Sequence, residues 1–140
     1  VTYNRGGLLA NKWSLLTTPV NNQKILEFAQ NSSNEIRVNT SVTPNRYAIA
    51  YYNDSNVINL KWEYFDTNTN SSFTFDVGTG FSLSRNFDGN VSFSGDLTTT
   101  SINKTVIANQ WNAVGNSYTT YYPLNKNGDN NFFNNIMEVQ

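Results

Sequence analysis

Neither cysteine nor histidine occurs in this chain of 140 residues. Without cysteine it can form no disulfide framework, no thiolate metal site and no thiol nucleophile. Without histidine it lacks the side chain that most often acts as a general base near neutral pH. Catalysis by two carboxylates stays open, with Glu63 and Asp66, or Asp76 with Asp88 or Asp96, as candidate pairs. No cleft-forming insertion accompanies these carboxylates, so we expect a protein that is not an enzyme.

Charged residues are also scarce. They make up 14% of the sequence and nearly cancel, with nine Lys and Arg against ten Asp and Glu. The nine cations are scattered singly, without the basic stripe that is typical of nucleic-acid-binding proteins. No apolar run approaches the roughly 20 residues of a membrane-spanning helix. We therefore expect neither a nucleic acid nor a membrane as a partner.

In place of charges, the sequence has many aromatic rings and uncharged polar groups. It contains nine Phe, eight Tyr and three Trp. Each such ring buries on the order of 150–250 Å², which suffices for a compact core with few aliphatic residues. The abundance of Asn, Ser and Thr suits an exported bacterial protein. No signal peptide is recognisable, because the chain opens inside a predicted strand, and we expect one domain, residues 1–140, excised from a larger secreted protein.

Apolar and polar residues alternate at period two through most of the chain, which predicts strands. Asp88-Gly89 predicts a tight hairpin turn between two of these strands, and Pro44-Asn45 predicts another turn. Short strands with turn signals roughly every 8–12 residues are typical of a β-sandwich. We therefore predict an all-β fold, an antiparallel, jelly-roll-like β-sandwich. The predicted strands are residues 35–39, 46–53, 59–65, 73–77, 80–85 and 90–95.

One or two short helices are expected to interrupt this pattern. An apolar stripe over residues 21–31 predicts a helix of about two turns, which Asn21 or Asn22 can cap. Residues 132–137 carry a second apolar cluster, which predicts either another short helix or a last strand.

One phrase occurs twice, as LLANKWSLLTTPV at residues 8–20 and as VIANQWNAVGNSY at residues 106–118. The alignment of the two copies places Trp13 over Trp111. Each copy has the pattern of a strand entered through Asn and anchored by Trp. Since a Trp in an apolar strand usually belongs to the core, we predict two equivalent strands with both indoles buried.

The order of four motifs resembles a known kind of module. NKWSLLTTPV, YAIAYYND with WEYF, GTGFSLSRNFDGNVSFSGDL and NQWNAVGNSY follow one another over residues 8–118. This order is similar to that of β-sandwich modules in exported Bacteroidota proteins that use the type IX secretion route. The chain departs from that pattern at Ser117 and Thr119, where the modules have prolines around the equivalent of Tyr118. The resemblance implies a secreted or cell-surface location, and attachment to polysaccharide-degrading enzymes or adhesins.

The composition and the resemblance together favour a non-catalytic carbohydrate-binding module. Such a module would tether a covalently linked catalytic domain to a polysaccharide, for instance one of marine algae. The alternative is a structural or adhesive spacer domain of a large cell-surface protein, whose rings would nearly all be buried.

Three stretches supply the candidate binding residues. The alternation in residues 46–53 leaves Tyr52 outward, and the tyrosines after Tyr118 lie in a predicted loop. Periodicity favours the core for Trp62, with the surface as the alternative. A sugar has an apolar C–H face that stacks on a ring and hydroxyls that need polar partners. The candidates are Tyr52, Trp62, Tyr121 and Tyr122 as stacking rings, with Lys61, Glu63 and Arg37 as polar contacts.

No cofactor is expected, and a metal site is weakly indicated. Asn125, Asn127 and Asp129 stand at alternate positions, as at the start of a calcium-binding loop. The sixth and twelfth positions, which want Gly and Glu, hold Asn130 and Ile136. An Asn-rich turn is the favoured interpretation, and a structural calcium ion elsewhere in the sandwich stays open.

Overall fold

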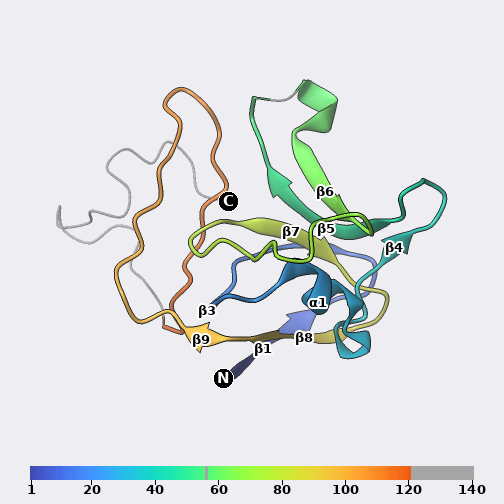
Figure 1. Ribbon diagram of the computed structural model, residues 1–140, viewed down its shortest axis with the longest axis horizontal. Coiled ribbons are helices and arrows are strands. Elements are labelled where there is room, and N and C mark those ends of the chain that lie inside the picture. The colour runs from blue at the N-terminus through green and yellow to red at the C-terminus, as the bar shows by residue number, and fades with distance from the viewer. Residues whose placement is uncertain (56, 121–140) are drawn as a thin grey trace.

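Antiparallel strands in two layers make up the computed structural model, which describes residues 1–55 and 57–120 (Figure 1). This arrangement confirms the prediction of an all-β sandwich with short helices. The elements in chain order are β1 (Thr2–Leu8), β2 (Trp13–Leu16), β3 (Val20–Asn21), α1 (Ile25–Gln30), η1 (Ser32–Asn34), β4 (Val38–Asn39), β5 (Arg46–Tyr52), η2 (Ile58–Leu60), β6 (Trp62–Asp66), β7 (Phe81–Ser84), β8 (Gly89–Ser94) and β9 (Asp96–Leu97).

The larger layer is a five-stranded sheet, here called the central sheet. Its strands follow the order β2-β7-β5-β4, and β6 also pairs with β5. The second layer contains the β1–β8 ladder, and the two-residue strands β3 and β9 pair separately. In Figure 1, β5 and β6 extend away from the body of the molecule, and α1 lies on the side of β1 and β8.

Phenylalanine rings occupy the middle of the core between the layers. Phe28 of α1 stacks on Phe93 of β8 with ring centroids 4.7 Å apart. Phe75 meets Phe28 edge to face at 5.1 Å and Phe81 of β7 at 4.9 Å. All four side chains are buried. The chain thus uses large rings where an aliphatic core would need more residues.

The predicted hairpin at Asp88-Gly89 is wrong, because β7 and β8 do not pair with each other. β7 pairs with β2 and β5, whereas β8 pairs with β1 in the other layer. Arg85, which is 4% exposed, holds this crossing by donating to the backbone carbonyls of Ser33, Asn34 and Phe87. Gly89 has a φ of +145°, which fits the turn signal but not the expected partner. A local signal predicts a turn, not the strand that follows it.

Side-chain amides complete the second layer on the edge of β8 that does not face β1. Asn34 is fully buried; its Oδ1 accepts from the Ser92 amide at 2.8 Å, and its Nδ2 donates to the Ser92 carbonyl at 3.4 Å. Gln23 Oε1 accepts from the Ser94 amide at 2.6 Å. These side chains satisfy backbone groups that another strand would otherwise pair.

The helix over residues 21–31 is confirmed, but its predicted cap is wrong. The N-cap residue is Lys24 and no side chain caps the helix, while Asn22 takes a left-handed φ of 65°. The predicted strand at residues 73–77 is also wrong. Phe73 and Phe75 instead exchange backbone hydrogen bonds with the residues that lead into α1, at 2.9 Å each.

The repeated phrase does not form two equivalent strands. The first copy contains β2, whereas the second copy makes a single bridge, from Val114 to Thr79. The indoles of Trp13 and Trp111 are 50% and 64% exposed, so the prediction that both are buried is wrong. What the copies share is the turn before each indole, where Asn11 and Asn109 have φ of 58° and 59°. The repeat therefore preserves a left-handed turn, not a strand.

Within residues 1–55 and 57–120, no helix is both long and apolar enough to cross a membrane. The predicted element at residues 132–137 lies outside the described residues.

Candidate functional site

The face of the central sheet that points away from the core, here called the outer face, combines large rings with very small residues. Its members follow from the registers, because Leu83, Ile49 and Phe65 face the core and their sequence neighbours point the opposite way. The outer face consists of Trp13, Leu15, Arg37, Arg46, Ala48, Ala50, Tyr52, Trp62, Tyr64, Asp66, Ser82 and Ser84.

Trp13 and Tyr64 form the first pair of rings on the outer face. They belong to β2 and β6, which lie three strand spacings apart, about 14 Å. Their ring centroids are nevertheless 5.9 Å apart with the planes at 64°, so both side chains lean over the strands between them. Ala50 and Ser82 lie on those intervening strands, where larger side chains would push the rings apart. Trp13 is 50% and Tyr64 is 43% exposed.

Tyr52 of β5 and Trp62 of β6 form the second pair, two residues along β6 from Tyr64. The two residues are cross-strand partners, with ring centroids 5.2 Å apart and planes at 69°. Trp62 is half-buried on the outer face, so the interpretation that placed it in the core is wrong. The physical reason is η2, which carries Ile58 and Leu60 away from the sheet and leaves them 82% and 62% exposed. Periodicity had assigned these residues and Trp62 to one apolar face.

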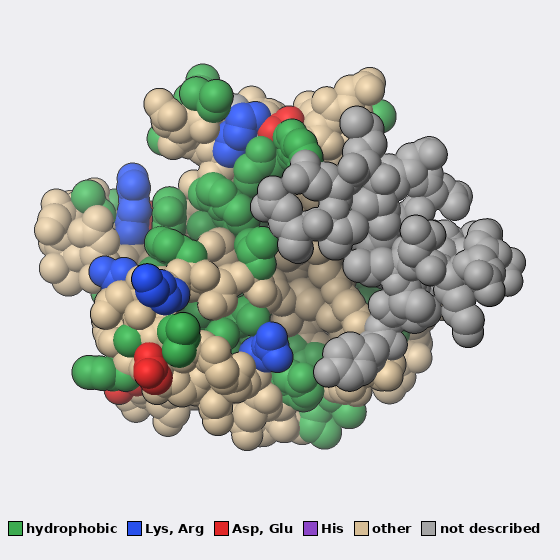
Figure 2. Space-filling model, turned by 180° about the vertical axis from the view of Figure 1, so that it is seen from behind, with side chains coloured by type: hydrophobic (Ala, Val, Ile, Leu, Met, Phe, Trp, Pro, Cys, Tyr) green, Lys and Arg blue, Asp and Glu red, His purple; other side chains and the backbone are tan. Residues whose placement is uncertain are grey.

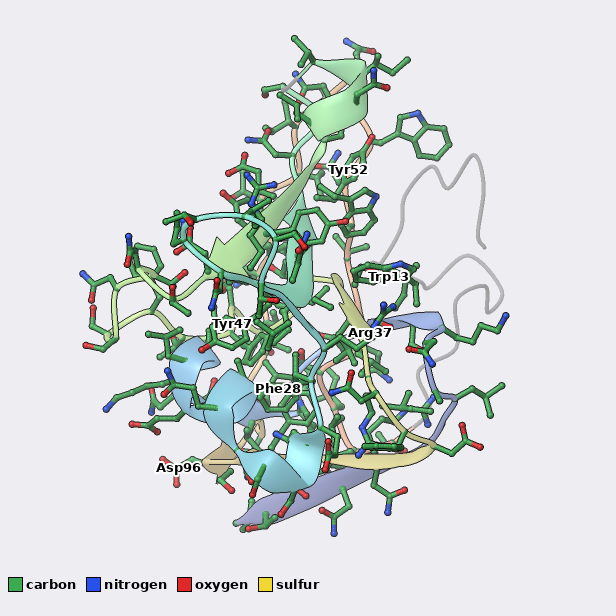
Figure 3. The ribbon with its side chains drawn as sticks, turned by 90° about the vertical axis from the view of Figure 1, so that its right-hand side faces the viewer. Trp13, Phe28, Arg37, Tyr47, Tyr52 and Asp96 are labelled. Carbon is green, nitrogen blue, oxygen red and sulfur yellow. The ribbon has the colours of Figure 1, made fainter. Side chains whose placement is uncertain are left out.

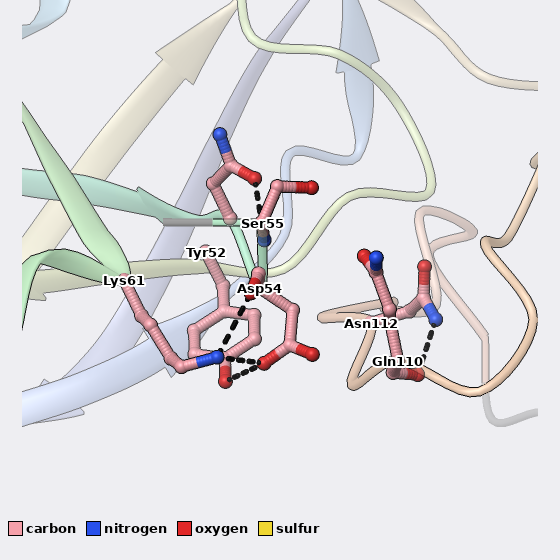
Figure 4. Close-up of polar contacts among 7 residues, drawn as sticks. Tyr52, Asp54, Ser55, Lys61, Gln110 and Asn112 are labelled. Carbon is pink, nitrogen blue, oxygen red and sulfur yellow. Dashed lines mark hydrogen bonds and ion pairs between the residues drawn. The ribbon is translucent and has the colours of Figure 1, made fainter. Parts of the chain in front are cut away.

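Lys61 is close to this second pair, but its ammonium is already bound. Its Nζ forms an ion pair with Asp54 Oδ1 at 2.5 Å and donates to the Asp54 carbonyl at 2.9 Å (Figure 4). Tyr52 donates its hydroxyl proton to the same carboxylate oxygen at 2.8 Å. The hydrogen bond from Lys61, with the one from Tyr52, lowers the pKa of Asp54 below its ordinary value. This cluster fixes the end of β5 against the start of β6.

Glu63 lies on the opposite face from Trp62, toward the core. Its carboxylate accepts hydrogen bonds from the Tyr51 hydroxyl and from Asn53 Nδ2, the latter at 2.6 Å. Burial, together with the hydrogen bond to Glu63 and the charge of that carboxylate, raises the pKa of Tyr51 to about 12. The structure therefore does not bring Glu63 together with the rings of the outer face.

Arg37 joins the outer face at the end where β5 and β7 separate. Its backbone is held between them, with Arg37 N donating to the Ser84 carbonyl at 3.1 Å and Ala48 N donating to the Arg37 carbonyl at 2.8 Å. Ile36 points into the core, so the half-buried Arg37 side chain points outward. Figure 3 shows Trp13, Arg37 and Tyr52 in one column along the sheet, with Phe28 and Tyr47 on the other side.

A cleft of about 380 Å³ lies beside Tyr52 of the second ring pair and continues to the core-facing rings Tyr51, Phe65 and Phe81. One wall includes Tyr52 at the end of β5 and Asp54 just after it, and the other comes from residues 104–114, which Figure 1 draws as a separate upright loop. Figure 2 shows the molecule from behind, with hydrophobic side chains gathered from its projecting upper end down its middle. Polar side chains of Asn53, Gln110 and Asn112 line the cleft together with Trp111.

The remaining predictions lie elsewhere in the chain. Tyr121, Tyr122 and the Asn125–Asp129 segment lie outside the described residues. Within the part of the chain that the structure describes, no three Asp or Glu side chains gather into a group that could hold a metal ion.

The sequence interpretation missed Trp13 and Tyr64 as surface rings. Both stand in strands where apolar residues occupy both faces, WSLL and WEYF, so alternation alone does not say which face is buried. The usable signal lies in neighbouring strands, because Ala48, Ala50, Ser82 and Ser84 are too small to be the inner lining of a core.

Comparisons with protein-family models, with curated proteins and with solved structures found no match to this chain.

Proposed function

We propose that this protein is a non-catalytic carbohydrate-binding module that holds a polysaccharide on its outer face. The observation that carries the proposal is the two ring pairs, Trp13–Tyr64 and Tyr52–Trp62, on one solvent-facing side of a rigid sheet. Trp13 alone is 50% exposed, although a Trp of a β-strand is normally consumed by packing.

The chemistry of sugars fits this surface. A pyranose ring has an apolar C–H face that stacks on an indole or phenol, and its hydroxyls exchange hydrogen bonds with polar neighbours. Rings held by a sheet are already ordered, so little side-chain entropy is lost when a ligand binds. We expect affinities between millimolar and micromolar, or about −4 to −8 kcal/mol.

The resemblance to exported Bacteroidota modules supports the wider setting of the proposal. Three of the four quoted motifs overlap β2, β5 with β6, or β7 with β8. In this proposal the module is secreted or displayed at the cell surface, and a catalytic domain is linked to it in the parent protein.

Affinity electrophoresis and isothermal titration against a panel of neutral and acidic polysaccharides test the proposal. We expect at least one polysaccharide to retard the protein. Trp13→Ala should weaken binding about tenfold or more, because aromatic side chains that become buried in an interface often carry much of the binding energy. Phe87→Ala is the matched control, because Phe87 is a 64% exposed ring on the β7–β8 connection, outside the strands of the central sheet.

The second candidate, a structural or adhesive spacer, draws support from the same ring pairs. Within each pair the rings contact each other, and Tyr52 and Trp62 are half-buried, so part of their area is already used within the molecule. No retention by any polysaccharide would favour the spacer and reject the binding module, whereas equal loss in Trp13→Ala and Phe87→Ala would reject the outer face as the binding surface.

A further inference from the structure

We infer that the sugar units recognised by the outer face are acidic, and that Arg37 is the residue that selects them. This inference rests on the proposed function and adds the chemical class of the ligand. Arg37 is one of three charged residues of the outer face, with Arg46 and Asp66. Among the described residues, no carboxylate oxygen lies within 4.0 Å of its guanidinium.

The other charges near the rings already have oppositely charged neighbours. Lys61 is paired with Asp54 at 2.5 Å, so this site beside Tyr52 and Trp62 is close to neutral. Arg46 and Asp66 stand opposite each other as cross-strand partners of β5 and β6, and their charges offset each other although no ion pair forms within 4.0 Å. Arg37 therefore leaves one net positive charge on the outer face.

The position of Arg37 relative to Trp13 is fixed by the sheet. Trp13 is the cross-strand partner of Ser84, and Arg37 N donates to the carbonyl of the same Ser84 at 3.1 Å. The backbones of Trp13 and Arg37 thus lie on either side of β7, about 10 Å apart. Between them Ser84 contributes only a small side chain, which leaves no bulky group between the indole and the guanidinium.

A sugar acid matches this spacing and these groups. Its ring can stack on Trp13 while the acidic substituent reaches toward Arg37. A guanidinium binds a carboxylate or a sulfate oxygen pair with two parallel hydrogen bonds, a geometry that a neutral hydroxymethyl group cannot reproduce. Trp13 thus supplies contact with any pyranose, and Arg37 supplies preference for an anionic one.

The decisive experiment compares polysaccharides that differ only in charge. Binding is measured by isothermal titration for a polyuronate and its carboxyl-reduced form, and for a sulfated galactan and its desulfated form. We expect tighter binding of an acidic member than of its neutral counterpart, with affinity that falls as salt is raised. The two pairs also identify the acidic group as a carboxylate or a sulfate ester.

Variants assign the preference to the residue. Arg37→Gln should weaken binding of the acidic member about tenfold to a hundredfold, and that of the neutral member far less. Arg37→Lys should recover part of the loss, because it restores the charge without the bidentate geometry. Arg5→Gln is the matched control, because Arg5 lies on β1 in the other layer and also has no carboxylate within 4.0 Å among the described residues.

The outcomes separate this inference from the function on which it rests. Equal affinity for acidic and neutral members, or equal effects of Arg37→Gln and Arg5→Gln, overturns the role of Arg37 and leaves the binding module standing. Absence of binding to every polysaccharide overturns both. Unchanged thermal unfolding of Arg37→Gln confirms that the variant is folded, which is expected because the Arg37 backbone hydrogen bonds do not involve its side chain.

Discussion

Both faces of the central sheet carry aromatic side chains, which are buried on the core side and partly exposed on the outer face. On the core side, Tyr47 and Phe81 belong to a buried cluster of other rings and aliphatic residues and are 6% and 4% exposed. On the outer face, Trp13 and Tyr64 stand over alanine and serine and stay about half exposed. The difference lies in the neighbours of each ring and not in the ring itself. Aromatic content therefore predicts neither burial nor binding until the residues across the strand are known.

The largest effect that separates the two faces should come from Phe28. Phe28→Ala removes a buried ring that stacks on Phe93 and should lower the free energy of unfolding by about 3–5 kcal/mol. Trp13→Ala removes a half-exposed ring and should cost about 1 kcal/mol. Urea denaturation followed by circular dichroism measures both variants. Similar losses would mean that Trp13 is a core residue in solution.

A smaller effect is expected when the small residues under the rings are enlarged. Ala50 lies on β5 between the two strands that carry Trp13 and Tyr64, and it is 1% exposed. Ala50→Leu should destabilise the protein by about 1–3 kcal/mol through overpacking and separate the two rings. The readouts are urea denaturation and the tryptophan fluorescence spectrum. A variant with unchanged stability and spectrum would show that the contact between Trp13 and Tyr64 does not depend on small side chains beneath the two rings.

The smallest effect concerns the carboxylate on the core side of β6. Glu63→Gln should lower the pKa of Tyr51 from about 12, but not to its ordinary value, because burial is the first cause of the shift. Tyrosinate absorbance against pH measures it, with Tyr51→Phe identifying the signal. Since the folded-state pKa lies above the unfolded one, this group's contribution to stability is complete below about pH 10 and is lost as the pH rises toward 12. An unchanged titration in Glu63→Gln would contradict the contact with Tyr51.

The sequence predicts which face of a strand is buried only where the side chains on its two faces differ in size. In β5 large side chains at Tyr47 and Ile49 alternate with Ala48 and Ala50, and the inward face was predicted correctly. In β6 both faces are aromatic, so the core-facing residue had to be found from the register. The short helix was predicted because its apolar stripe is confined to one side.

Long-range pairing is the part that local patterns do not contain. The glycine after Asp88 does have a positive φ, at the first residue of β8, yet β7 and β8 join different layers. The candidate site also depends on long-range pairing that local patterns do not contain. Tyr52, Trp62 and Lys61 belong to two strands that are close in sequence, and the structure brings them together, while Trp13 meets Tyr64 only through the order of four strands.

The amides of Asn34 and Gln23 have one more consequence, for how such molecules associate. An unpaired sheet edge is a template on which another chain can add a strand. On this edge of β8 the backbone amides of Ser92 and Ser94 already donate to the side chains of Asn34 and Gln23. Two side chains thus pair backbone groups that would otherwise need another strand. Addition of a strand from another chain is therefore blocked on this side of β8 at Ser92 and Ser94.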